Sequence, residues 1–256
     1  MIKLIASDLD GTLLKNGAQQ INDDTMKVLQ KALDAGILFA PASGRMHHSL
    51  MKLFAPIQDR IIYIADNGAF VKYQGETIVK RTLNRATAFE LMEDIYQVPN
   101  CEFVASGEDC AYMKPKSEAF RHRMTKIVNY DMVEIEDFEE IPEDIIKVSV
   151  CDMSGIVHSQ EHFLEGWKNR TCVAVSGELF MDMTAAGVNK GFALQKICAY
   201  FGWSAQECAA FGDNFNDVEM LDFAGYSYAM ERAVPEVKQH AKFVTDSVEK
   251  EVLKWL

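Results

Sequence analysis

Short apolar runs alternate with amphipathic stretches at both ends of the chain. Residues 2–9 are mostly apolar and lead into polar residues and Gly11, a pattern typical of a buried parallel strand that enters a loop. A helix is expected to follow, with Asn22 or Asp23 as its N-cap and Gly36 just beyond its end. Further elements are expected at 37–42 (strand), 45–54 (helix), 60–65 (strand), 190–200 (helix), 208–211 (strand), 217–223 (helix), 226–230 (strand), 235–241 (helix), 243–245 (strand) and from there to 256 (helix). This alternation predicts an α/β fold, a doubly wound parallel, Rossmann-like sheet.

The alternation is interrupted in the middle of the chain. A hairpin is expected around Gln74-Gly75, and no regular strand–helix rhythm follows it. In the intervening segment, residues 86–96 and 117–128 are helix-like, and residues 146–151 and 171–176 are strand-like. Residues 134–143 form an acidic connection. We interpret 1–83 and 184–256 as one catalytic core, and 84–183 as an inserted α+β domain. A single continuous domain is the alternative, which the resumed alternation disfavours.

The charge balance restricts the partners. The 256 residues include 26 Lys and Arg against 38 Asp and Glu, a net charge of −12. Such a protein repels the phosphate backbone of nucleic acids and anionic membranes, so neither is an expected partner. A small anionic substrate stays possible if some of the carboxylates bind a cation that inverts the local charge.

Cysteine usage and hydropathy indicate a cytoplasmic protein. The six cysteines lie far apart with no C-x-x-C pair, and we interpret them as reduced thiols. The first residues reach Asp8 before a signal-peptide hydrophobic region could form, and no stretch approaches the roughly 20 apolar residues of a membrane span. The sequence gives no indication of the oligomeric state.

Candidate chemistry follows the first strand and a later strand. Strand alternation predicts that Asp8 and Asp10, within Asp8-Leu9-Asp10-Gly11-Thr12, project from the same side, where they would repel each other unless a cation such as Mg²⁺ intervened. An Asp-Gly turn is the alternative. A second acidic loop, residues 212–217, also follows an apolar strand. Since open α/β sheets bind ligands at the carboxyl ends of their strands, the two loops would share one crevice if their strands are neighbours.

Two weaker signals complete the pattern. Ser43-Gly44 follows the second strand, where a hydroxyl and a free N–H at a helix start suit a phosphate oxygen, although an ordinary N-cap is equally compatible. Lys190 opens a helix after the insertion. Arg45 and the adjacent histidines, in contrast, are interpreted as solvated.

In this order the four motifs resemble those of the haloacid dehalogenase superfamily, and within it the Cof-type phosphatases whose inserted C2-type cap selects the substrate. The matching segments are Asp8-Leu9-Asp10-Gly11-Thr12, Ser43, Lys190 and Gly212-Asp213-Asn214-Phe215-Asn216-Asp217, together with Asp66-Asn67-Gly68 after the third strand. The resemblance implies an Mg-dependent phosphatase that hydrolyses small phosphorylated metabolites, such as sugar phosphates, through an aspartyl-phosphate.

The resemblance also implies roles for individual residues. Asp8 would be the nucleophile, and Asp10 the general acid and then the general base. Mg²⁺ would be held by Asp8, the backbone carbonyl of Asp10, and Asp213. Asp217 would orient Lys190 or a water molecule on the metal, and Asn214 could exchange roles with it. The residues implied to hold the phosphoryl group are Leu9, Ser43, Gly44, Lys190 and Asn216, with Thr12 supporting the loop.

Two other functions fit part of the pattern. A phosphomutase would transfer the phosphoryl group within a sugar if the inserted domain excluded water. A non-catalytic phospho-receiver also needs an aspartate, metal-binding carboxylates and a lysine. Asp10 argues against the receiver, because a stable phosphoryl signal is incompatible with a general base two residues from the phosphorylated group.

Overall fold

The computed structural model, which describes residues 1–128 and 132–256, contains two compact units. One consists of Met1–Lys80 with Asn189–Leu256, and the other is Arg81–Val188. The boundaries between the units therefore lie after residues 80 and 188, whereas the sequence predicts them after residues 83 and 183. Each unit has its own apolar core.

The first unit is built on a five-stranded sheet in which every neighbouring pair is parallel. Its strands, in spatial order, are β14 (Phe243–Thr245), β13 (Tyr226–Met230), β12 (Cys208–Gly212), β1 (Leu4–Ser7) and β2 (Leu38–Pro41). Its helices are α1 (Asp23–Asp34), α2 (His47–Leu53), α6 (Lys190–Phe201), α7 (Val218–Phe223), α8 (Pro235–Lys238) and α9 (Val248–Val252). The direct parallel pairing of β1 with the central strand β12 brings their following loops to the same edge of the sheet.

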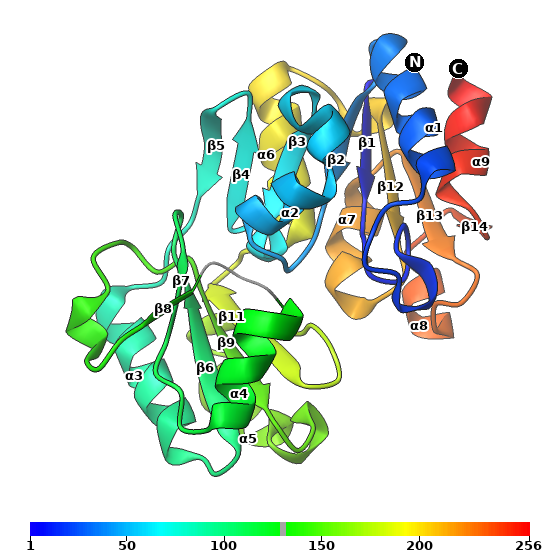
Figure 1. Cartoon of the computed structure of the whole chain (residues 1–256). Helices are drawn as coiled ribbons and strands as arrows, with labels where there is room; N and C mark the ends of the chain where they lie inside the picture. Colours follow the sequence, from blue (N-terminus) through cyan, green and yellow to red (C-terminus); the bar gives the residue numbers. More distant parts are fainter. Residues whose placement is uncertain (129–131) are drawn as a thin grey trace. The chain divides into compact units, whose positions relative to one another are not determined.

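Helices cover both faces of this sheet (Figure 1). On one face, α6 and α7 pack against each other and against strand residues such as Leu4, Ala6 and Ala210. Successive strand residues point to opposite faces, so the intervening Ile5 and Ala209 face α1 and α9, which pack together. Burial on both faces explains why the strands are apolar throughout. The predicted doubly wound α/β core is confirmed.

The strand expected at 60–65 belongs to a different sheet. β3 (Ile62–Ala65) pairs antiparallel with β4 (Phe70–Tyr73), which pairs antiparallel with β5 (Glu76–Lys80). A parallel bridge between Ala42 and Ile64 joins β3 to the end of the main sheet. The predicted parallel pairing with the main sheet is thus limited to this bridge, and the regular partner of β3 is β4, which follows after a short turn that can join only antiparallel neighbours.

The second unit is α+β, as predicted, on a mostly antiparallel sheet. Its strands, in spatial order, are β10 (Thr171–Val175), β11 (Phe180–Ala185), β9 (Lys147–Asp152), β6 (Cys101–Ser106), β7 (Ala111–Met113) and β8 (Met132–Glu134). Helices α3 (Arg85–Gln97) and α5 (Gln160–Trp167) contribute to the same apolar core as the alternate residues of the central strands. The helix expected at 117–128 is instead a short α4 (Glu118–His122) followed by a π-helical turn at Arg123–Val128.

Helices are short throughout the described residues. α3 has 13 residues, and α1 and α6 have 12 each. Crossing a bilayer takes about 20 predominantly apolar residues. Accordingly, none of the helices within 1–128 and 132–256 meets the requirement for a membrane span.

Candidate active site

Asp8 follows the last residue of β1, which lies between β12 and β2 in the parallel sheet. Its backbone N–H donates to the carbonyl of Phe211 on β12 over 2.9 Å, which extends the sheet pairing beyond the strand. The side chain is buried, and its Oδ1 accepts a 2.6 Å hydrogen bond from Nζ of Lys190. Its Oδ2 is also buried but has no hydrogen-bond donor among the described residues. One carboxylate oxygen is therefore held in place while the other is left without a partner.

Lys190 lies at the first turn of α6, below the sheet edge. The side chain of Asn189 caps this helix by accepting the N–H of Phe192 over 2.7 Å. Lys190 is completely buried, and its Nζ also donates to Oδ1 of Asp217 over 2.7 Å. Burial lowers the pKa of Lys190, but the carboxylates of Asp217 and Asp8 outweigh that effect, so its pKa lies above its ordinary value. The ammonium group is thus a fixed positive charge between two carboxylates.

Burial raises the pKa of Asp8 well above its ordinary value. The positive charge of Lys190 opposes this shift, while the nearby carboxylates of Asp217 and Asp213 add to it. The ammonium of Lys190 is shared by the buried carboxylates of Asp8 and Asp217, which leaves an excess of negative charge in a place with little water. An additional cation would relieve that excess and favour the ionised form of Asp8.

Asp217 organises the loop after β12. Its Oδ2 accepts the backbone N–H groups of Asp213 (2.9 Å) and Asn214 (3.1 Å), while Asn214 accepts the N–H of Phe215 (2.8 Å). Gly212 makes this fold of the loop possible, because a Cβ there would lie 2.5 Å from Cβ of Asp217. The loop thereby turns back so that Asp213 and Asp217 approach the end of β1.

Asp213 connects the two acidic loops. Its Oδ1 accepts the hydroxyl of Thr12 over 3.0 Å, and its Oδ2 accepts Nη2 and Nε of Arg232 over 2.7 and 3.0 Å. Arg232 also lies close to Gly11, where a Cβ would come 1.5 Å from its Nη2. Gly11 has φ of +107°, a conformation that favours glycine, so the backbone requires glycine here. Leu9 stabilises the same turn, since its carbonyl accepts the N–H groups of Thr12 and Leu14.

The carboxylates of Asp8, Asp213 and Asp217 suit a divalent cation. One oxygen from each lies within 4.8 Å of the others. A buried carboxylate oxygen without a donor is energetically unfavourable, and Oδ2 of Asp8 is such an atom. Hard cations such as Mg²⁺ prefer carboxylate oxygens, so the residues present fit this ion. The carboxylate of Asp10 does not belong to this cluster.

Asp10 instead forms an ion pair with Arg45. Its Oδ1 accepts Nη2 of Arg45 over 2.6 Å and its Oδ2 accepts Nε over 3.1 Å, a two-pronged pairing. Strand alternation does not apply to Asp8 and Asp10, because β1 ends at Ser7 and the chain then turns. Arg45 was interpreted as solvated, and the structure corrects that: its side chain is about three-quarters buried.

The loops after β2 and β3 form a second group with Asn216. The N–H of Asn67 donates to the carbonyl of Ser43 over 2.9 Å, and Nδ2 of Asn216 donates to Oδ1 of Asn67 over 3.2 Å. Oδ1 of Asn216 is buried without a partner among the described residues. Asn67 has φ of +54°, so this network holds a backbone conformation that is unfavourable for non-glycine residues.

Ser43 does not cap the helix that follows it. The predicted start at Arg45 was two residues too early, since α2 begins at His47 after Met46 as N-cap. The hydroxyl of Ser43 accepts the N–H of Arg45 over 3.2 Å, and Gly44 lies between them, partly buried. Ser43 therefore stabilises the loop that positions Arg45.

The structure thus brings the predicted residues together in two groups. Asp8, Thr12, Lys190, Asp213, Asn214 and Asp217 form one connected network, and Ser43 and Asn216 join through Asn67. Arg232 and the pairing of Arg45 were missed. The only available signal for Arg45 was its place directly after Ser43-Gly44, and we find none for Arg232.

Comparisons with known proteins agree with the geometry. Residues 5–255 match the family model for haloacid dehalogenase-like hydrolases. A protein of Escherichia coli (strain K12) named 5-amino-6-(5-phospho-D-ribitylamino)uracil phosphatase is 30% identical over 260 residues, covering 98% of this chain and 93% of the relative. A Bacillus subtilis (strain 168) phosphatase with the same substrate in its name is 28% identical over 273 residues, covering 96% and 93%.

A solved structure supports the same relationship. A protein of Eubacterium rectale has a TM-score of 0.87 and 31% sequence identity. The likeness covers 100% of this chain and 99% of that protein, so it extends over both compact units.

Proposed function

Because the chain belongs to the haloacid dehalogenase-like hydrolases, we propose that it is an Mg²⁺-dependent phosphatase of small phosphorylated metabolites that works through an aspartyl-phosphate on Asp8. The observation that carries the proposal is the state of the Asp8 carboxylate. Lys190 fixes its Oδ1, whereas its Oδ2 is buried and has no donor among the described residues. Because a carboxylate has two oxygens, Asp8 held in this orientation can bind the cation through one of them and attack phosphorus with the other.

The ion would be held by the carboxylates of Asp8 and Asp213 and, as the family resemblance implies, the carbonyl of Asp10. Asp217 is committed to Lys190 and to two backbone N–H groups, so it supports the site rather than providing a free ligand. When bound, Mg²⁺ supplies positive charge that offsets the repulsion between the anionic nucleophile and the anionic phosphoryl group.

The proposed reaction has two displacement steps. Asp8 attacks phosphorus, the bond from phosphorus to the leaving oxygen breaks, and Asp10 protonates that oxygen. Asp10 then removes a proton from water, which attacks phosphorus as the bond to Asp8 breaks, releasing phosphate and restoring the carboxylate of Asp8 and the protonated form of Asp10. Lys190, Ser43 and the amide of Gly44 would stabilise the phosphoryl oxygens, together with Leu9 and Asn216. Thr12 and Asn214 would maintain the loops.

The unit Arg81–Val188 is proposed to act as the cap that selects the leaving group. The relatives named as 5-amino-6-(5-phospho-D-ribitylamino)uracil phosphatases make that phosphomonoester the first candidate substrate for this chain. A location in the cytoplasm is consistent with such a substrate and stays a prediction.

Metal removal is expected to abolish hydrolysis. The purified protein should release phosphate from p-nitrophenyl phosphate, and faster from its physiological substrate, over many turnovers with Mg²⁺ present. EDTA should reduce the rate to background, since the positive charge that offsets the repulsion between the Asp8 carboxylate and the phosphoryl group would then be lost, and excess Mg²⁺ should restore it. Phosphate release is measured continuously, with 5-amino-6-(5-phospho-D-ribitylamino)uracil, sugar phosphates and nucleotides as a substrate panel.

Other outcomes would favour the alternative functions. Full activity in EDTA would contradict the metal assignment while leaving the phosphatase intact. A single round of protein labelling without phosphate release would indicate a receiver. Conversion of one sugar phosphate into its isomer would indicate a phosphomutase.

Substitution of Arg45 by Met should lower kcat by about ten- to a hundred-fold without unfolding the protein. Arg45 holds the general acid through two hydrogen bonds, and a misplaced catalytic group reduces the rate by this order. The measurement is kcat and KM with p-nitrophenyl phosphate. Arg60→Met is the matched control, because Arg60 pairs with Asp34 at an exposed place on the surface, and it should retain wild-type kcat. Equal kcat values for the two variants would contradict a positioning role for Arg45.

A further inference from the structure

Arg232 occupies an oxygen of Asp213 that the proposed metal ion needs. Both Nε and Nη2 of Arg232 donate to Oδ2 of Asp213, while Oδ1 accepts the hydroxyl of Thr12. Each oxygen of this carboxylate therefore already has a donor. A divalent cation that binds Asp213 must displace or repel one of these partners, and a guanidinium carries the same sign of charge as the ion.

Arg232 is the partner that can leave. The side chain of Thr12 is completely buried, whereas the side chain of Arg232 is 50% exposed. Moving an exposed, flexible arginine disturbs less packing than moving a buried threonine in the turn that carries Asp8. Displacement by the metal should therefore affect Arg232 first.

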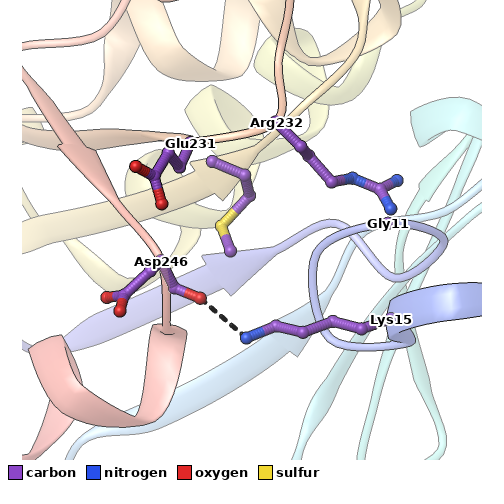
Figure 2. A pocket seen from close by; sticks show the side chains of 6 residues that line it. Gly11, Lys15, Glu231, Arg232 and Asp246 are labelled. Carbon is purple, nitrogen blue, oxygen red and sulfur yellow. Dashed lines mark hydrogen bonds between the residues drawn. The ribbon is translucent and has the colours of Figure 1, made fainter.

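A pocket next to Arg232 can receive the displaced guanidinium. It has a volume of about 320 Å³ and is lined by Gly11, Lys15, Met230, Glu231, Arg232 and Asp246. Figure 2 shows Glu231 and Asp246 on one side, with the guanidinium of Arg232 directed away from them toward Gly11. The Glu231 carboxylate forms no ion pair with any described residue, and Asp246 has a distant partner in Lys250 at 3.5 Å. Two carboxylates thus lie within the same pocket as the arginine, but it is not paired with them.

We propose that Arg232 is a latch with two positions, on Asp213 when the metal is absent and on Glu231 and Asp246 when the metal is bound. The proposal rests on the metal site proposed above. In the first position the arginine neutralises Asp213 and holds it in place. In the second it leaves Oδ2 to the cation and forms a new ion pair, which partly offsets the loss of the old one. Arg232 therefore sets how tightly the protein binds its ion.

The test is direct titration of the substrate-free protein with Mg²⁺ by isothermal titration calorimetry. Arg232→Met removes the competing cation but keeps much of the apolar stem, so the Kd for Mg²⁺ should fall by about five-fold, the size expected for a partly exposed ion pair. Glu231→Gln removes one carboxylate from the second position, so the Kd should rise by about two- to three-fold. In the double variant, Glu231→Gln should no longer raise the Kd, since there is no arginine left to pair with the Glu231 carboxylate.

Lys15→Met is the matched control for charge alone. Lys15 lines the same pocket but does not contact Asp213, and its Nζ donates to the backbone carbonyl of Asp246. Its removal should change the Kd by less than about two-fold. Circular dichroism and thermal unfolding confirm that each variant is folded.

Three results would overturn the latch alone. Weaker or unchanged Mg²⁺ binding by Arg232→Met would mean that the arginine merely fixes Asp213. If Lys15→Met lowered the Kd for Mg²⁺ as much as Arg232→Met does, the effect of Arg232 would be one of long-range charge alone. If Glu231→Gln still raised the Kd for Mg²⁺ in the absence of Arg232, the proposed second position of the arginine would be contradicted. Failure of the wild-type protein to bind Mg²⁺ would instead refute the metal site itself, and the latch with it.

Discussion

Asp8→Asn is expected to lower kcat by at least about 10⁴-fold, the largest loss of any single substitution, because it removes the proposed nucleophile. The amide has almost the same shape as the carboxylate, and its oxygen can still accept the hydrogen bond from Lys190. It carries no charge with which to attack phosphorus. Phosphate release under substrate saturation, together with loss of covalent labelling of the protein, is the measurement.

The same substitution should hardly affect folding, which separates chemistry from stability. Burial already raises the pKa of Asp8, so the fold gains little from its ionised form. We expect the free energy of unfolding to change by less than about 1 kcal/mol. Asp24→Asn, on an exposed aspartate of α1, is the matched control and should have the kcat and the free energy of unfolding of the wild type. Activity of Asp8→Asn within ten-fold of the wild type would remove Asp8 as the nucleophile.

The core could be predicted from the sequence because its strands have a local signature. A parallel strand covered on both faces, such as β12, is an apolar run, and the bounds of β12, β13 and β14 match the expected residues almost to their ends. The same local signal does not define pairing. β3 lies within the expected range, but its regular ladder is antiparallel with β4 and only one bridge connects it to the parallel sheet, since pairing depends on the length of the connection that follows.

The inserted unit was less predictable for a related reason. β6 is fully buried along its length, yet it includes Glu102 and Ser106, so neither an apolar run nor a regular alternation marks it. β7 and β8 have three residues each, too few to display a period. Such strands depend on their neighbours in the sheet rather than on their own sequence.

The candidate site divides in the same way. Asp8 and Asp213 follow strands that pair directly, so the topology alone brings their loops together, as the sequence suggested. The partners of long side chains depend on how loops turn in three dimensions. Arg45 on Asp10 and Arg232 on Asp213 are therefore visible only in the structure, although each arginine controls one of the carboxylates on which the proposed chemistry depends.

Lys190→Met should both inactivate the enzyme and destabilise it by about 3–5 kcal/mol near neutral pH, in contrast to Asp8→Asn. The buried ammonium bonds the carboxylates of Asp8 and Asp217, and removal of one partner from a buried ion pair leaves uncompensated charge. Methionine fills a similar volume, so the loss is electrostatic rather than a cavity effect. Urea unfolding of the metal-free proteins at several pH values measures it.

The pH dependence of that loss gives the stricter test. Without Lys190, nothing opposes the burial that raises the pKa of Asp8, so the folded variant holds its proton at a higher pH than the unfolded chain does. A carboxyl whose pKa is higher in the folded state stabilises the fold below that pKa and loses this contribution as pH rises. The stability deficit relative to wild type should therefore be smaller at pH 5 than at pH 8. Adding Asp217→Asn to Lys190→Met should recover part of the stability at pH 8 but no activity, because it removes one of the two unpaired charges without restoring the cation. A loss of stability in Lys190→Met that is the same at pH 5 and pH 8 would contradict this account and would show that Lys190 stabilises the fold by packing rather than by its charge.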